Sequence, residues 1–128
     1  MTRRATTIRE RRRTYRLARF AVLHRYHTHL TLQEVARTVA ASPRSVQRAY
    51  AQFGTMSFHE ELVARRLDAA TRLLSDTPMA VAEVAQRVGY RQPPHFARMF
   101  RRHYGIAPSA YRARMLKARR QHSEASGA

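Results

Sequence analysis

Arginine is the residue type in this sequence with the clearest capacity for chemistry. The chain has 128 residues and carries 25 Lys and Arg against 8 Asp and Glu, so its formal net charge is +17. Every one of these basic residues is an arginine except Lys117. A guanidinium is a planar fork of donors that matches phosphate oxygens and the O6 and N7 atoms of guanine. The charge therefore predicts a polyanionic partner: nucleic acid, an anionic membrane or an acidic protein.

One segment of the second half has a helix-turn-helix pattern. This segment, 79–105, opens with apolar residues that share one face of a helix, namely Val81, Val84, Ala85 and Val88. Gly89 can then reverse the chain, and Pro93 and Pro94 suit the first turn of a second helix. The second helix turns apolar residues inward and arginines outward: Phe96, Met99 and Phe100 against Arg98, Arg101 and Arg102. The pattern is typical of a helix that enters a DNA major groove, and two core helices with solvated arginines would share it.

The first half contains a second segment of the same design. Thr31 and Glu34 form a capping box that opens one helix, and Ser42 with Pro43 opens the next, which extends to about Phe53. The two segments align as an internal repeat, in which Leu32, Glu34, Val35, Ala36 and Val39 precede Val81, Glu83, Val84, Ala85 and Val88 by 49 residues. Basic charge alone does not require a duplicated turn, so the repeat favours recognition of duplex DNA.

The remaining helices complete an all-α fold. Helices are predicted over 9–27, over 57–74 after a capping box at Ser57 and Glu60, and from Ala107 onward. The helix that follows Ser57 is long enough to join the two helix-turn-helix segments. We therefore expect about seven helices in five parts: a flexible basic N-terminus (1–8), a first helix-turn-helix subdomain (9–55), a linking helix (56–76), a second helix-turn-helix subdomain (77–118) and a disordered tail (119–128).

Several classes of protein are disfavoured by what the sequence lacks. It has no cysteine, which excludes disulfides and cysteine-based sites, and no apolar run near the ~20 residues of a membrane span. His24, His27 and His29 are close in sequence, but no carboxylate completes a ligand set, so we expect neither metal nor cofactor. Paired carboxylates, a glycine-rich phosphate loop and a nucleophile motif are all missing. We expect a soluble intracellular protein that is not an enzyme.

Two stretches of the chain resemble a known family. ARRLDAATRLLSD at 64–76 and VAEVAQRVGYRQPPHFARMFRRHYGIAPSAYR at 81–112 resemble the DNA-binding domain of AraC/XylS-type bacterial transcription regulators. The most specific elements are an A-x-x-V-G-[FY] turn, then F-x-R-x-F and G-x-x-P-x-x-[YF]-R, which stand here at 85–90, 96–100 and 105–112.

This resemblance implies seven helices in two helix-turn-helix subdomains, sequence-specific binding of double-stranded promoter DNA and activation through contacts with RNA polymerase in the bacterial cytoplasm, at the nucleoid. Because the chain has 128 residues, we expect no separate effector domain. It therefore resembles the small single-domain members, which act as monomers on an asymmetric site.

The resemblance also places base-reading positions on the second helix of each subdomain. In the first subdomain these are Arg44, Gln47 and Arg48, and in the second they are Pro93, Pro94, His95 and Arg98. The two prolines replace polar residues that are usual in the family, so we expect the first helix to carry more of the base readout. Phosphate contacts are expected from other polar and basic residues: Arg12, Arg13, Arg16, Ser42, Ser45, Gln52, Arg91, Gln92, Arg101, Arg102, His103 and Ser109.

Two other interpretations belong to different functional classes. A nonspecific architectural protein that binds DNA or RNA would need the charge but not the repeat. A module that grips RNA polymerase, with secondary DNA contact, would use acidic residues of the linking helix, for which Glu60, Glu61 and Asp68 are the candidates. The basic N-terminal segment is either a phosphate-contacting first helix or a solubilising arm.

Overall fold

The computed structural model describes residues 2–127, and side chains from residue 7 onward. This part of the chain forms seven α-helices and no strand, which confirms the predicted all-α class. The helices are α1 (Thr2–Arg25), α2 (Leu32–Thr38), α3 (Pro43–Phe53), α4 (Phe58–Asp76), α5 (Val81–Arg87), α6 (Pro93–Tyr104) and α7 (Pro108–Gly127).

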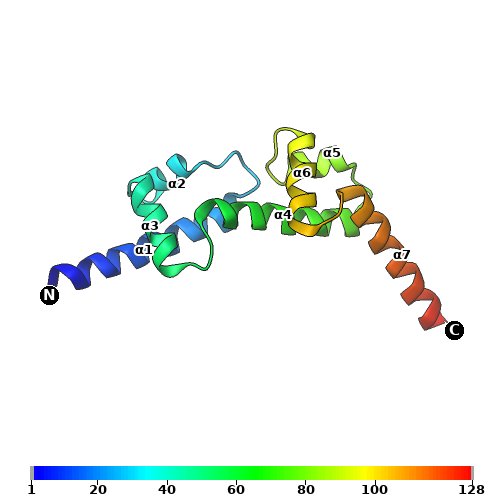
Figure 1. The fold of residues 1–128 in the computed structure, drawn as a ribbon, viewed down its shortest axis with the longest axis horizontal. Coiled ribbons are helices and arrows are strands. Elements are labelled where there is room, and N and C mark those ends of the chain that lie inside the picture. Colours follow the sequence, from blue (N-terminus) through cyan, green and yellow to red (C-terminus); the bar gives the residue numbers. More distant parts are fainter. Residues whose placement is uncertain (1, 128) are drawn as a thin grey trace. The chain divides into compact units, whose positions relative to one another are not determined.

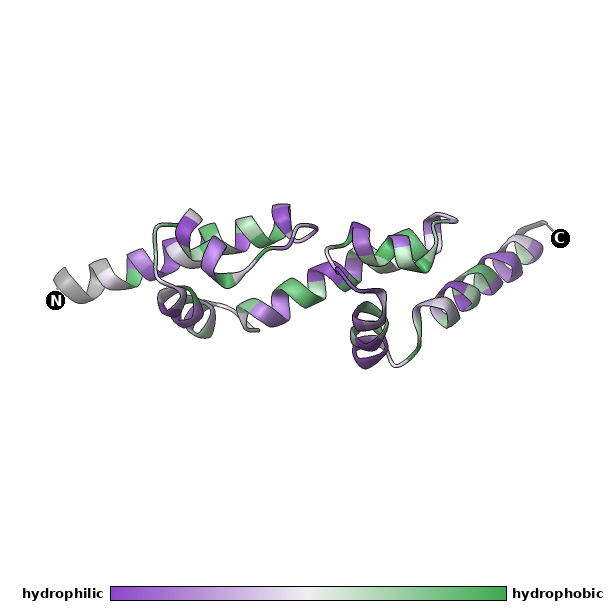
Figure 2. Ribbon diagram, turned by 90° about the horizontal axis from the view of Figure 1, so that it is seen from above, coloured by the Kyte–Doolittle hydropathy of each residue, from purple (hydrophilic) through white to green (hydrophobic). Residues whose placement is uncertain are grey.

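Two compact units divide the chain (Figure 1). The first ends at Arg66 and the second begins at Leu67, so the boundary falls inside α4 and not at the ends of a separate linking segment. Within the first unit α3 packs on α1 and α2, and within the second α6 packs on α5 and α7. Figure 2 shows hydrophilic and hydrophobic residues alternating along the helices, as amphipathic helices require.

The two terminal helices are longer than the sequence predicted. Helix α1 begins at Thr2 and not near residue 9, and α7 continues to Gly127 through the segment expected to be a disordered tail. The expectation of a flexible N-terminus partly concerns Met1, which lies outside the described residues. Both extensions are mostly polar in sequence, so no apolar stripe marked them as helices.

Each unit has its own apolar core. In the first unit the largest fully buried side chains are Val22, Val35, Val46 and Tyr50, and in the second they are Leu67, Leu74, Val84, Val88, Phe96 and Phe100. The inward-facing residues expected for α3 and α6 are buried, apart from Met99, which is half-buried. Burial of these side chains holds α3 and α6 in place by the hydrophobic effect, at about 1.5–3 kcal/mol for each large side chain.

The helix-turn-helix turns repeat in atomic detail. The N–H of Ala41 donates to the oxygen of Ala36 at 2.9 Å, and 49 residues later the N–H of Tyr90 donates to the oxygen of Ala85 at the same distance. The residue before each donor has a positive φ, +56° at Ala40 and +107° at Gly89. Alanine therefore occupies in the first turn a left-handed position that suits glycine.

Substitutions at Ala40 and at Gly105, which also has a positive φ, are expected to change stability in opposite directions. Ala40→Gly removes a strained φ from an exposed residue and should raise the free energy of unfolding by about 0.5–1 kcal/mol. Gly105→Ala should lower the free energy of unfolding by about 1 kcal/mol, because φ is +82°. An added Cβ meets no atom within 4 Å, so the loss comes from backbone strain and not from a clash. Urea unfolding of both variants measures the two effects, and equal signs would contradict the assignment to backbone strain.

Candidate nucleic-acid interface

Helix α3 presents a row of polar side chains on its outer face. Its buried face carries Val46, Ala49 and Tyr50, and the i, i+3, i+4 spacing leaves Arg44, Gln47 and Arg48 exposed together on the opposite face. Within the described part of the chain, none of these three side chains forms a hydrogen bond or ion pair to another residue. Their donors therefore remain available to a ligand outside the protein.

The start of α3 is held by a cap. The Ser42 hydroxyl accepts from the N–H of Ser45 at 3.0 Å and donates to the Ser45 hydroxyl at 2.9 Å. Pro43 occupies the first helical position, where its missing N–H costs nothing. The start predicted from Ser42 and Pro43 is confirmed. Both serines expected to contact phosphate thus lie where backbone N–H groups favour an anion.

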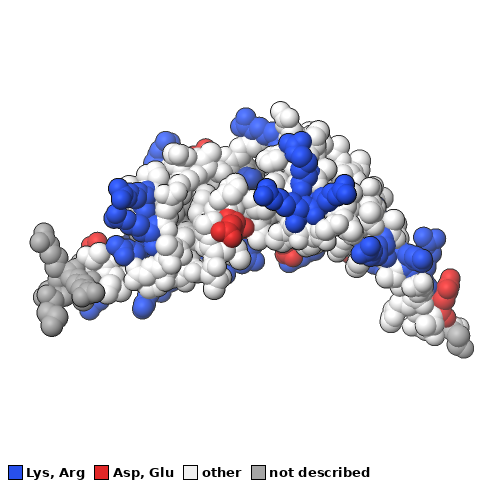
Figure 3. Space-filling model, viewed as in Figure 1, with Lys and Arg blue, Asp and Glu red and all other residues white. Residues whose placement is uncertain are grey.

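Helix α6 presents a corresponding surface in the second unit. The oxygen of Gln92 accepts the N–H groups of His95 and Phe96, at 3.1 and 3.2 Å, and the Gln92 side chain makes no capping hydrogen bond. The His95 ring packs edge-on against Tyr90, with ring centroids 5.4 Å apart, while Arg98 is exposed. The other candidate residues in this unit are also exposed: Arg91, Gln92, Pro94, Arg101, Arg102, His103 and Ser109. Figure 3 shows a group of basic side chains on each unit and few acidic ones on the visible face.

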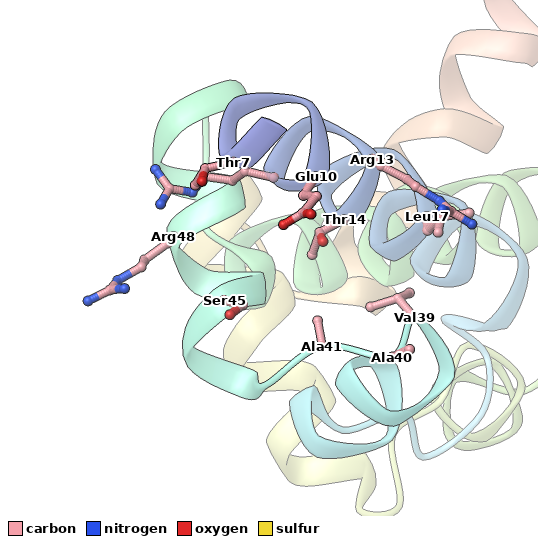
Figure 4. Close-up of a pocket in the computed structure, with 11 residues that line it drawn as sticks. Thr7, Glu10, Arg13, Thr14, Leu17, Val39, Ala40, Ala41, Ser45 and Arg48 are labelled. Atoms are coloured by element: carbon pink, nitrogen blue, oxygen red, sulfur yellow. The ribbon is translucent and has the colours of Figure 1, made fainter. Parts of the chain in front are cut away.

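A groove of about 420 Å³ separates α1 from the first turn and the start of α3 (Figure 4). Its walls carry Arg13 of α1 together with Ser45 and Arg48 of α3. One groove thus joins expected phosphate contacts to an expected base reader. The structure adds three residues that the sequence interpretation missed: Glu10, Arg11 and Thr14. Glu10, Thr14 and Leu17 follow helical spacing inside the helix predicted over 9–27, so this face could have been found from the sequence.

The basic segment of α1 is tied to the end of α3. Arg11 donates to the side-chain oxygen of Gln52 at 2.7 Å, and the guanidinium of Arg12 lies 5.2 Å from the ring centroid of Phe53. Such a cation–π contact at an exposed site is worth about 0.5–1 kcal/mol. Arg13 and Arg16 remain exposed beside these pairs. The segment is therefore part of the folded first unit and brings its charge to the α3 side.

A buried carboxylate fixes α3 against its neighbours. The Tyr50 hydroxyl of α3 donates to Glu61 Oε1 at 2.8 Å, and Arg19 Nε of α1 donates to Glu61 Oε2 at 3.2 Å. Glu61 is only 5% exposed, so its expected role as an exposed contact for another protein is wrong. Glu61 faces Tyr50 of α3, whereas Glu60 and Asp68 are exposed as predicted. We call Arg19, Tyr50 and Glu61 the carboxylate clamp.

The clamp makes stability depend on pH at the alkaline end. Burial, followed by the hydrogen bond to Glu61, raises the pKa of Tyr50 above its ordinary value of 10.0. Below pH 10 the folded and unfolded chains both keep this proton. At higher pH the unfolded chain loses the proton and the folded chain keeps it, so the free energy of unfolding falls by about 1.4 kcal/mol per pH unit.

Tyr50→Phe should remove most of this alkaline loss. Urea unfolding of the wild type and the variant at pH values on either side of 10 measures it. Burial also raises the pKa of Tyr104 in the second unit, so a smaller alkaline loss should persist. An unchanged slope in Tyr50→Phe would contradict the role given to this proton.

The second unit replaces the clamp with aromatic packing. Phe100 and Tyr111, which lie 50 residues after Tyr50 and Glu61, pack edge to face with ring centroids 5.6 Å apart. Each unit also has an arginine that binds backbone oxygens. In the second unit Arg112 donates to the backbone oxygens of Leu74, Thr77 and Met79. Arg66 does the same in the first unit, donating to the oxygens of Tyr26 and Thr28 at 2.8 Å. These two arginines therefore hold helix ends and are not free for a ligand.

Among residues 2–127, no three His, Cys, Asp or Glu side chains come close enough to hold a metal ion. The His24 ring instead packs on Phe20, with centroids 4.0 Å apart. None of the described helices is both long and apolar enough to cross a membrane.

These features define a class of protein. Two units each carry a helix-turn-helix whose second helix exposes unpaired arginine, the arrangement of helix-turn-helix proteins that bind nucleic acid. A helix-turn-helix domain model matches residues 35–114. The chain belongs to the AraC-type helix-turn-helix family of DNA-binding transcription regulators.

Individual relatives and structures agree with this assignment. The transcriptional regulator YpdC of Escherichia coli is 36% identical over 89 residues, which cover 70% of this chain and 31% of YpdC. The transcriptional activator NphR of Rhodococcus is 36% identical over 83 residues, covering 65% and 24% of the two chains. The chain thus spans a third or less of the length of these curated relatives.

Solved structures show the same fold. The C-terminal domain of AraT, a response regulator from Geobacillus stearothermophilus, superposes with a TM-score of 0.76 at 32% identity, covering 78% of this chain and 84% of that one. The DNA-binding domain of AdpA, a global transcriptional factor solved with a target DNA, gives a TM-score of 0.77 at 29% identity, covering 85% and 97%.

Proposed function

We propose that this chain binds specific promoter DNA by inserting α3 and α6 into successive major grooves, and that it activates transcription from there. The observation that carries the proposal is the exposed, unpaired set of Arg44, Gln47 and Arg48 on a helix whose opposite face is fully buried. A rigid helix with free donors on one side suits the major groove, which admits an α-helix and displays a distinct pattern for each base pair.

Base readout by α3 follows from the chemistry of its side chains. Arg48 is the proposed guanine reader, since its fork can donate to O6 and N7 together, and Gln47 suits the N6 and N7 atoms of adenine. Arg44 lies one turn before Arg48, so it can read or clamp the neighbouring step. The carboxylate clamp holds α3 while these side chains bind.

Readout by α6 relies on fewer hydrogen bonds. Pro94 is exposed and has no N–H to donate, so it suits contact with a thymine methyl group. Arg98 supplies the guanine contact, and His95 is already oriented by the edge of Tyr90. We therefore propose that α3 contributes more discrimination than α6.

Contacts with phosphate supply most of the affinity and none of the sequence information. In the first unit the proposed contacts are Arg12, Arg13, Arg16, Ser42, Ser45 and Gln52. In the second unit they are Arg91, Gln92, Arg101, Arg102, His103 and Ser109. Because Arg11 already binds the Gln52 oxygen, the Gln52 amide is the part left for phosphate.

One chain with two unlike recognition helices suits an asymmetric site. Successive major grooves on one face of DNA lie about 34 Å apart. A monomer that reads both needs no two-fold partner, and we propose this state at the nucleoid in the bacterial cytoplasm. The relative NphR is named a transcriptional activator, which supports activation here, and Glu60 and Asp68 offer exposed carboxylates for RNA polymerase.

Selection from a random duplex library at about 150 mM salt tests the proposal. We expect two short motifs separated by about one helical turn in the retained DNA. Titration of the selected site should show affinity falling by roughly 10³–10⁵ between about 50 and 200 mM salt, as expected for 6–10 phosphate contacts. Enrichment of no motif, with the same salt dependence, would instead establish a nonspecific architectural protein.

A pull-down with RNA polymerase in the absence of DNA tests the activation step. If RNA polymerase retains the wild type but not the Glu60→Lys and Asp68→Lys variants, the result would support a polymerase contact on α4. Retention of neither the wild type nor the variants would contradict this part of the proposal and leave DNA binding unaffected.

A further inference from the structure

The outer side of α1 exposes apolar side chains that the first core does not use. Phe20 is 63% exposed and Leu17 is 41% exposed, although both lie in a helix that buries Ala18 and Val22 in the first core. Single exposed apolar residues are ordinary, but neighbouring ones around a hollow mark an interaction site.

These residues line a hollow between α1 and the end of α2. Its volume is about 190 Å³, and its walls are Leu17, Phe20, Ala21, His24 and Arg25 from α1, with Thr38 and Val39. The rings of Phe20 and His24 pack in a tilted arrangement and give one wall an aromatic surface. The volume is below the roughly 300–1,000 Å³ of small-molecule sites, so the hollow suits side-chain anchors of a larger partner.

The hollow continues into the groove of Figure 4, because Leu17 and Val39 line both. Together they follow α1 from Thr7 to Arg25, a length of about 27 Å at 1.5 Å per residue. The path is therefore long enough to receive several turns of a helix lying along α1.

The rim of this path is strongly basic. Arg13 and Arg25 are exposed beside the apolar residues, and Arg16 lies exposed on the same side of α1. Arg13 and Arg16 are also proposed phosphate contacts, so a partner bound to this rim competes with DNA for these two side chains. Glu10 is the acidic residue among those that line the two hollows. An apolar floor with a positive rim is complementary to a partner that is apolar on one face and acidic on the other.

We infer that this path along α1, between Leu17, Phe20 and Val39, is a docking groove for an acidic amphipathic helix of a protein partner. Such a helix places apolar side chains at i, i+3, i+4 and i+7 in the hollow and its carboxylates against the rim arginines. Duplex DNA has no apolar face to cover Phe20. A second copy of this chain would bring another +17 of charge to an already basic surface.

Synthetic peptides of about four turns test the inference with no DNA present. One panel carries Leu, Ile or Phe at i, i+3, i+4 and i+7 and Glu elsewhere, and matched controls have the same composition with the apolar residues scattered. By fluorescence anisotropy at about 150 mM salt, at least one amphipathic peptide should bind tenfold or more tightly than its scrambled control. Phe20→Ser should remove that difference.

Leu116→Ser is the matched control variant, since Leu116 is 44% exposed in the second unit, and it should leave the difference intact. Equal binding of amphipathic and scrambled peptides would overturn the inference, because charge alone would then explain it. Equal effects of the two serine variants would also overturn it. So would a loss in Phe20→Ser of duplex DNA affinity or of self-association seen by sedimentation, since these would assign the groove to DNA or to a second copy. DNA selection by the wild type is a separate readout, so failure here leaves the proposed function standing.

Discussion

Glu61→Ala is expected to lower the free energy of unfolding by about 2–3 kcal/mol. The substitution leaves the buried Tyr50 hydroxyl without its acceptor, and an unsatisfied buried donor costs about 1–3 kcal/mol. Loss of the charged hydrogen bond from Arg19 adds a smaller amount, because the Arg19 side chain is 44% exposed and water replaces its partner. Urea unfolding measures the change.

The double variant Tyr50→Phe with Glu61→Leu is the control. It removes both polar partners and imitates the apolar pairing of Phe100 with Tyr111 in the second unit. Because an apolar pair leaves no buried polar atom unsatisfied, it should recover most of the stability that Glu61→Ala loses. If the double variant is as unstable as the single one, the cost lies in packing and not in the hydrogen bond.

The clamp should also be visible in DNA recognition. In Glu61→Ala, α3 is held less rigidly. We therefore expect weaker binding to the part of the selected site that α3 reads, while the part read by α6 keeps its affinity. Glu60→Ala changes a neighbouring carboxylate that is exposed and accepts from the N–H of Ser57, at 3.4 Å, in a helix cap. It should cost about 1 kcal/mol of stability at most and leave both sub-sites unchanged.

Arg48→Ala is expected to abolish discrimination at one base pair of the selected site, at a cost of about 1–3 kcal/mol in specific binding. The reason is that its unpaired fork lies exposed on the face of α3 opposite Val46 and Tyr50. Selection from the random library with the variant protein should return a site in which one position has become degenerate.

Arg98→Ala makes the matching test in the second unit, where we expect a smaller loss of discrimination. Arg37→Ala, an exposed arginine of α2 outside the recognition helix, is the control and should leave every position readable. Weaker binding to all sequences alike, with the motif unchanged, would make Arg48 a phosphate clamp and not a reader.

The core of each helix-turn-helix could be predicted from the sequence, because the information there is local. Helix starts follow from side chains a few residues apart, as at Thr31, whose hydroxyl accepts the N–H of Glu34. Apolar spacing of 3.6 residues shows which face is buried, and Phe96 and Phe100 are indeed buried. The motif residues that carry the family resemblance lie in the same segments, so the fold class followed from them.

The ends of the chain were predicted less well for a physical reason. Helix α1 begins before residue 9 and α7 extends past 118, in stretches that are mostly polar in sequence. No apolar stripe at helical spacing marks either stretch. The sequence could not distinguish such a helix from a flexible segment.

By itself the sequence determined the class of the protein: two helix-turn-helix units, a large positive charge and exposed arginines on the second helix of each. Only the tertiary structure decided which polar residues are buried and which apolar ones are left exposed. Glu61 follows two other polar residues, His59 and Glu60, yet it is buried because it binds Tyr50 and Arg19, which lie 11 and 42 residues away in the chain. Phe20 is apolar, as core residues are, yet its side chain is exposed among the described residues of its unit. Burial depends on contacts between segments distant in the chain, and local spacing carries no information about them.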